Sequence, residues 1–280
     1  MIYTYNDIAT NTAFSALGIQ LQQAYTTEDI PVLDDSTVLI IMSYNVQDFR
    51  GINAQSAMQK SIVDKYTPHV VGVQEFYTSN TVPAIASNMF QGYNLVRTNH
   101  KNFNAVASTM SLTDVVIKDF EAQDPNDMTL YGETRCYMKG YVTFADKRIC
   151  VVNTHMCLSL SYQEQQMLEI MDLVSNEDYF VLTGDFNVGC LSEEDSYWVS
   201  MYKPLVDSGY NLANCTEERG FTYTFFGGSS PYNGSRSCPD NIITSGNIAI
   251  NNVIYDETKF SNLTGDAIDH IPMIAYLTVN

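Results

Sequence analysis

Polar residues stand at the ends of several apolar runs that are typical of buried strands. These residues are Asn45, Glu75, His155, Asp185, Asn187, Asp240, Asp269 and His270. Because strand ends in a layered sheet fold converge on one rim, these side chains could share a pocket. Asparagine and carboxylate oxygens suit a hard divalent cation such as Mg²⁺ or Mn²⁺, which can polarise a phosphoryl oxygen and lower the pKa of a bound water. A nearby aspartate and histidine could position or deprotonate that water.

The apolar runs predict the strands that position these residues. Continuous apolar segments that end in polar residues favour buried strands. We expect such strands at 38–43, 69–73, 148–153, 179–183, 241–245 and 271–277. Further strands are expected at 93–96, 104–109, 115–120, 135–144 and 248–255, with a hairpin turn at 145–147.

Two helices are also predicted. Apolar residues at helical spacing indicate one over 57–66. The segment Ser161-Tyr162-Gln163-Glu164 has the pattern of a capping box and predicts the start of the second. Strands outnumber helices, and hairpins mix with strand–helix–strand units. We therefore expect mixed sheets covered by helices.

The chain is strongly acidic, with 14 Lys and Arg against 32 Asp and Glu and a net charge of −18 over 280 residues. Surfaces that bind nucleic acid are usually basic, because affinity comes from neutralising phosphates. A polyanionic substrate would therefore have to be bound through cations or a local patch. No apolar run approaches the ~20 residues of a membrane span.

Residues 1–36 are predicted to form an N-terminal arm ahead of a catalytic domain at 37–280. Phe14, Leu17 and Leu21 recur at helical spacing, and the arm could either pack on its own domain or dock a protein partner. The N-terminus has no basic start followed by an apolar stretch, so we expect no signal peptide and an intracellular location. The six cysteines include no C-x-x-C pair, and we expect them to be mostly reduced.

Seven short motifs occur in order along residues 38 to 279. They are Ser43-Tyr44-Asn45-Val46, Val73-Gln74-Glu75, Glu133-Thr134-Arg135, Asn153-Thr154-His155-Met156, Gly184-Asp185-Phe186-Asn187, Asp240-Asn241-Ile242-Ile243-Thr244-Ser245 and Asp269-His270-Ile271-Pro272. In this order the chain resembles the endonuclease/exonuclease/phosphatase superfamily, the deoxyribonuclease-I-like metal-dependent phosphoesterases. The resemblance implies an α/β fold, a four-layer α/β/β/α sandwich of two packed mixed sheets with the site at one rim.

The resemblance also implies roles for the residues of the site. Asn45, Glu75 and Asp269 are expected around the metal ion, with Glu75 as the chief direct ligand. Asp185 is expected to activate or orient the attacking water. Asn187 is expected to hold the phosphate or the nucleophile.

The remaining implied roles concern contacts to the phosphate. His270, oriented by Asp240, is expected to contact the scissile phosphate and to stabilise charge in the transition state. Arg135 and His155 are expected to bind phosphate as well, with His155 also a candidate acid. In the deoxyribonuclease branch this first histidine pairs with a glutamate from an earlier strand, but residues 99–117 contain none.

Two positions depart from the family pattern. Ile268 stands where a serine usually precedes the final Asp-His pair, and Asn241 stands where an aromatic residue usually follows the aspartate. From the resemblance we expect the first change to remove a supporting hydrogen bond.

Three functions are compatible with the sequence. The leading one is a nuclease that cleaves DNA, with RNA as an alternative substrate. The alternative is a phosphodiesterase or phosphatase for a small or lipid-headgroup ester, since the superfamily contains both kinds of enzyme. The third is a non-catalytic interaction module that docks through residues 1–36.

Overall fold

The computed structural model describes residues 37–47, 54–76, 89–98, 103–130, 134–226, 236–257 and 269–280. The predicted arm at 1–36 lies outside these residues, as does Ile268. None of the helices in the described ranges has the length and apolar character that crossing a membrane requires.

The first sheet contains six strands in the order β13-β14-β1-β2-β4-β3. They are β1 (Val38–Asn45), β2 (Val70–Gln74), β3 (Asn94–Arg97), β4 (Ala105–Ser108), β13 (Ile248–Tyr255) and β14 (Met273–Val279). β1 and β2 are parallel, and the other neighbours are antiparallel. The central strands β1 and β2 are buried on both faces, in agreement with their continuous apolar sequences.

The second sheet also has six strands, in the order β5-β6-β7-β8-β12-β9. They are β5 (Thr113–Asp119), β6 (Cys136–Phe144), β7 (Lys147–His155), β8 (Phe180–Asp185), β9 (Asn211–Leu212) and β12 (Asp240–Thr244). β7 and β8 are parallel. The predicted hairpin between β6 and β7 is confirmed, and its two linking residues, Ala145 and Asp146, both have positive φ as a tight primed turn requires.

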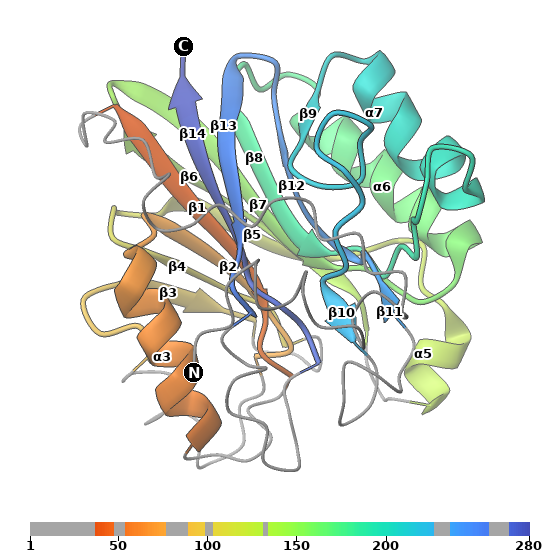
Figure 1. Cartoon of the computed structure of the whole chain (residues 1–280), viewed down its shortest axis with the longest axis horizontal. Helices are drawn as coiled ribbons and strands as arrows, with labels where there is room; N and C mark the ends of the chain where they lie inside the picture. Colours follow the sequence, from red (N-terminus) through yellow and green to blue (C-terminus); the bar gives the residue numbers. More distant parts are fainter. Residues whose placement is uncertain are drawn as a thin grey trace, which may run out of the picture.

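Helices cover the outer faces of the two sheets (Figure 1). The helical elements are α3 (Ala54–Tyr66), α5 (Pro125–Leu130), α6 (Leu160–Val174), η2 (Trp198–Tyr202) and α7 (Lys203–Asp207). α3 packs Ile62 and Val63 on the first sheet, while α6 packs Met167 and Ile170 on the second. A third apolar cluster lies between the sheets. The predicted four-layer α/β/β/α sandwich is therefore confirmed.

The capping box expected at Ser161 is wrong. The N-cap of α6 is Ser159, and the helix begins at Leu160. The backbone amides of Tyr162 and Gln163 both donate to Ser159 O, so the helical turn closes two residues earlier than the sequence pattern indicates. The glutamate of the expected box, Glu164, therefore lies at the fifth helical position, too far along the helix to reach back to the N-cap amide.

A polar network joins the two sheets beneath the rim where the motif residues lie. The Asn153 amide on β7 donates to Val73 O at 2.9 Å and to Ala105 O at 3.0 Å, both in the first sheet. Asn153 Oδ1 accepts from Gln74 Nε2 at 2.6 Å and from Thr183 Oγ1 at 3.0 Å. These side chains are fully buried, so each bond satisfies a group that would be costly to leave unpaired.

The backbone of Gly72 on β2 lies close against the side chains of Thr183 and Asn153 of the second sheet. A Cβ at Gly72 would lie 1.9 Å from Thr183 Oγ1 and 2.6 Å from Asn153 Oδ1. Gly72→Ala is expected to lower the free energy of unfolding by about 2–3 kcal/mol, because it forces the network apart. Urea denaturation measures the change. The control is Gly189→Ala, whose Cβ would make an ordinary 3.6 Å contact with Tyr197 and should cost less than about 1 kcal/mol; equal losses in the two variants would contradict the prediction.

Candidate active site

Two strands of the second sheet, β7 and β8, end at one rim, and the antiparallel strand β12 begins there. In the register, Asp185 at the end of β8 lies opposite His155 of β7 on one side and Asp240 of β12 on the other. Cross-strand partners project to the same face of a sheet, so the three side chains form one row. All three are at least 95% buried.

The first sheet contributes Asn45 and Glu75 to the same rim. Asn45 ends β1 opposite Gln74, and Glu75 follows β2 directly. The Asn45 amide nitrogen donates to Glu75 Oε1 at 3.1 Å and to Asp185 Oδ2 at 2.9 Å. One side chain thus connects the carboxylates of the two sheets.

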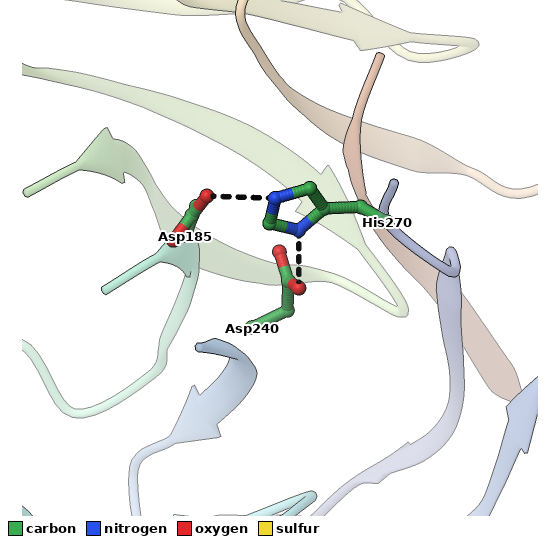
Figure 2. Close-up of side chains that lie close together, drawn as sticks. All are labelled: Asp185, Asp240 and His270. Carbon is green, nitrogen blue, oxygen red and sulfur yellow. Dashed lines mark hydrogen bonds and ion pairs between the residues drawn. The ribbon is translucent and has the colours of Figure 1, made fainter. Parts of the chain in front are cut away.

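His270, which precedes β14, lies between two aspartates (Figure 2). Its Nδ1 donates to Asp240 Oδ2 at 2.8 Å, and its Nε2 lies 3.5 Å from Asp185 Oδ2. Burial alone would lower the pKa of His270, but the carboxylates of Asp240, Asp185 and Asp269 outweigh it and raise the pKa to about 10. The ring is therefore a cation at neutral pH, and both of its nitrogens carry protons.

Glu75 is held in an unfavourable environment for a carboxylate. Burial raises its pKa to about 7, and the nearby charges of Asp185 and Asp269 act in the same direction. His270 and the Asn45 amide oppose the shift without cancelling it. The site therefore contains more negative charge than its own side chains neutralise.

His155 and Arg135 form a second, adjoining part of the rim. His155 Nε2 lies 3.6 Å from Asp185 Oδ2, which is beyond hydrogen-bond distance. Burial, together with the charge of Arg135, lowers the pKa of His155 to about 3, so this ring is neutral. Arg135 itself is buried, and its Nε donates to Asp127 Oδ2 at 3.0 Å.

Asn187 lies two residues after Asp185, just beyond the end of β8. Its backbone amide donates to Asp185 Oδ1 at 2.9 Å, and its side chain donates to Met156 O at 2.7 Å. Gln163 on α6 donates to Asn187 O at 3.0 Å, which anchors this loop to the helix. Asn187 thus fixes the orientation of Asp185, in addition to its expected contact with substrate.

The structure adds side chains that the motifs did not identify. Gln47 contacts Asp269, and Asp127 is the partner of Arg135. Phe225 lies in the short hairpin of β10 (Phe225–Phe226) and β11 (Arg236–Ser237), with its ring centroid 5.1 Å from that of His270. Gln47 had a usable signal, since it is a polar residue just beyond a predicted strand end. The other two contacts have no local sequence signature.

Three residues of this rim have a strained backbone conformation. Gln47, Glu75 and Asn187 are non-glycine residues with φ of 47°, 53° and 54°. This left-handed conformation is unfavourable for residues with a Cβ and persists only where surrounding contacts hold it. Each of the three has such a contact to another residue of the site.

Asn241 and Asn214 explain how the chain accommodates one departure from the family motif. The Asn241 side chain is buried and exchanges two hydrogen bonds with the backbone of Asn214, at 2.9 and 3.0 Å. These bonds attach the start of β12, and with it Asp240, to the segment that follows β9. The amide thus takes over a supporting position that the family usually gives to an aromatic ring.

Two sets of residues have the donor types that a metal ion requires. The ligand atoms of Asp185, Asp240 and His270 all lie within 4.8 Å of one another. Because His270 is protonated on both nitrogens and bonded to Asp240, it has no free lone pair for a metal ion. The cluster is better described as a protonated His270 held by Asp240, with the carboxylate of Asp185 on its other side.

The second set is Glu75, Asp269 and Asn45, whose oxygens suit a hard divalent cation. Its charge supports the fit: four carboxylates meet at the rim beside the single imidazolium of His270, and burial raises the Glu75 pKa to about 7. A divalent cation would neutralise this excess. Its ligands would be Glu75 and Asp269, with Asn45 adjacent.

Solved structures with the same fold are numerous. D. rerio TDP2 in complex with a single-strand DNA product matches with a TM-score of 0.67 and 16% identity over 86% of this chain and 99% of that chain. The human Nocturnin catalytic domain matches at 0.61 and 14%, over 87% and 95%. Bacteroides thetaiotaomicron mannosyl-6-phosphatase matches at 0.64 and 14%, over 86% and 99%. At these identities the matches establish the fold.

The sequence comparisons give the family. No curated protein sequence matches the chain. A family model does match it, over residues 42–259, and this range includes every motif except the final Asp-His pair. The chain therefore belongs to the Endonuclease/Exonuclease/phosphatase family of phosphoester hydrolases.

Proposed function

We propose that the protein is a divalent-metal-dependent phosphodiesterase that cleaves DNA. The observation that carries the proposal is the buried Asp240–His270 pair facing Asp185, with Glu75 at hydrogen-bonding distance from the same Asn45 amide. This arrangement offers an acceptor for the proton of water, a fixed cation for a phosphoryl oxygen and a concentration of carboxylates for a metal ion. Mg²⁺ or Mn²⁺ fits the oxygen donors.

The residues divide the work of hydrolysis. Glu75 and Asp269 hold the cation, which supplies positive charge to the phosphoryl group when bound. Asp185 orients a water molecule and accepts its proton as the water oxygen bonds to phosphorus. The bond from phosphorus to the leaving oxygen breaks on the opposite side, and this oxygen departs with the electron pair and takes a proton from solvent. His270 donates from Nε2 to a phosphoryl oxygen, while Asp240 holds the ring in position.

His155 and Asn187 complete the proposed site. Neutral His155 binds a phosphate oxygen through Nε2, while Arg135 is buried against Asp127. Asn187 keeps Asp185 aligned through the bond from its backbone amide. Because water is the attacking group, no covalent intermediate forms between enzyme and substrate.

DNA is the proposed substrate because the fold is shared with TDP2, which was solved with a single-strand DNA product. A small phosphate ester is the second candidate, and charge favours it. Seven basic residues of the described part of the chain each pair with a carboxylate. They are Lys60, Lys65, Lys118, Arg135, Lys139, Arg148 and Lys203. Paired in this way, they contribute little net positive charge for binding a polyanion.

A substrate panel separates the two candidates. Supercoiled plasmid, single-stranded DNA, RNA, bis(p-nitrophenyl) phosphate and mannose 6-phosphate are each incubated with Mg²⁺ or Mn²⁺, and product is measured with time. We expect single-stranded DNA to be cleaved, and EDTA to abolish the activity because the carboxylates then lack their cation. Hydrolysis of the small esters alone would overturn the nuclease assignment and favour the second candidate. Activity that persists in EDTA would overturn the metal dependence.

Asp240→Asn tests the role of the histidine pair. The substitution keeps the shape of the side chain but removes the charge that favours protonated His270, so kcat is expected to fall about 10²–10³-fold. Steady-state kinetics with single-stranded DNA measure the loss. Asp114→Asn is the matched control, because Asp114 is exposed and, within the described residues, its ion pair is with exposed Arg148. A kcat within threefold of wild type for Asp240→Asn would exclude this role.

A further inference from the structure

Gln47 makes three hydrogen bonds to residues of the site, although it belongs to none of the motifs. Its side-chain Nε2 donates to Asp269 Oδ2 at 2.8 Å, and its Oε1 accepts from the Asp269 backbone amide at 3.1 Å. Its own backbone amide donates to Asn45 Oδ1 at 2.9 Å. Gln47 and Asp269 are 222 positions apart in the sequence, so the contact is purely tertiary.

The two bonds to Asp269 restrain both the backbone and the side chain of that residue. With Oδ2 held by Gln47, the other oxygen, Oδ1, lies on the side of His270, 3.9 Å from Nε2. One oxygen of Asp269 is thus occupied by the glutamine, and the other is presented to the site. A side chain held at two points loses rotational freedom before any ligand binds.

The bond to Asn45 fixes a second group. Because Asn45 Oδ1 accepts from the Gln47 backbone, the amide nitrogen of Asn45 is directed to Glu75 and Asp185. Gln47 therefore contacts two of the three residues expected around the cation and determines how each is oriented.

The chemical type of the side chain matters as well. A glutamine amide can bind a carboxylate without neutralising it, whereas lysine or arginine would replace the charge that a divalent cation supplies. Its φ of 47° shows that the local backbone accepts an unfavourable conformation to place this amide.

We propose that Gln47 is a positioning residue that sets the affinity of the site for its divalent cation by fixing the Asp269 carboxylate. The inference rests on the proposed metal-dependent function. Partners that orient metal ligands through hydrogen bonds commonly change metal affinity 10–100-fold when they are removed.

The test is direct titration of Mn²⁺ into metal-free protein by isothermal calorimetry, with no substrate present. Gln47→Met keeps the length of the side chain and removes its two hydrogen bonds to Asp269. We expect the Kd for Mn²⁺ to rise at least about tenfold, and kcat at saturating Mn²⁺ to stay within about threefold of wild type. Gln165→Met is the matched control, since the exposed side chain of Gln165 on α6 donates to Ser161 O within its own helix. The Kd of this variant should equal that of wild type.

The outcomes separate this inference from the proposed function. An unchanged Kd for Gln47→Met, with wild type binding Mn²⁺, would overturn the role of Gln47 and leave the metal-dependent function standing. A wild-type protein that binds no Mn²⁺ would overturn both. If Gln47→Met does not fold, Gln47→Asn serves in its place. The shorter amide cannot reach both Asp269 atoms, and its Kd should also rise; a wild-type Kd for this variant would overturn the inference.

Discussion

At the rim where the two sheets meet, the side-chain amide of Asn45 donates to a carboxylate from each of them. Glu75 and Asp185 would otherwise repel each other in surroundings with little water to screen them. The amide has two N–H groups at a fixed angle, so it holds the two groups close without cancelling their charge. The spacing of the other site residues follows from this bridge, because Asp185 is also the neighbour of both histidines.

The two histidines differ because of the charges around them, even though each lies near the same Asp185 oxygen. His270 has a second carboxylate at hydrogen-bond distance and is a cation, whereas His155 is buried beside Arg135 and is neutral. The same side chain thus serves two chemical functions within one site. The buried guanidinium of Arg135 is paired with the buried carboxylate of Asp127.

Much of the site can be predicted from the chain because it depends on strand ends. Asp185 stands at the end of one apolar run and Asp240 at the start of another. Once those two runs pair in register, the two residues must lie side by side. The partner of Gln47 and the contacts of Asn153 could not be predicted, because they join segments distant in the sequence and have no periodic pattern; those of Asn153 also cross from one sheet to the other. The start of α6 is predicted two residues too late because Ser159, like Ser161, is a residue type that favours the N-cap position.

The network around Asn153 also limits how the molecule can move. Contacts between apolar side chains have no preferred direction, so they alone do little to fix the position of one sheet along the other. Hydrogen bonds are directional, and the bonds from Asn153 to backbone groups of the opposite sheet break on a shift of an ångström or two. Relative shear of the two layers is therefore blocked directly behind the site. The catalytic groups at the ends of the strands of the two sheets therefore keep a constant separation.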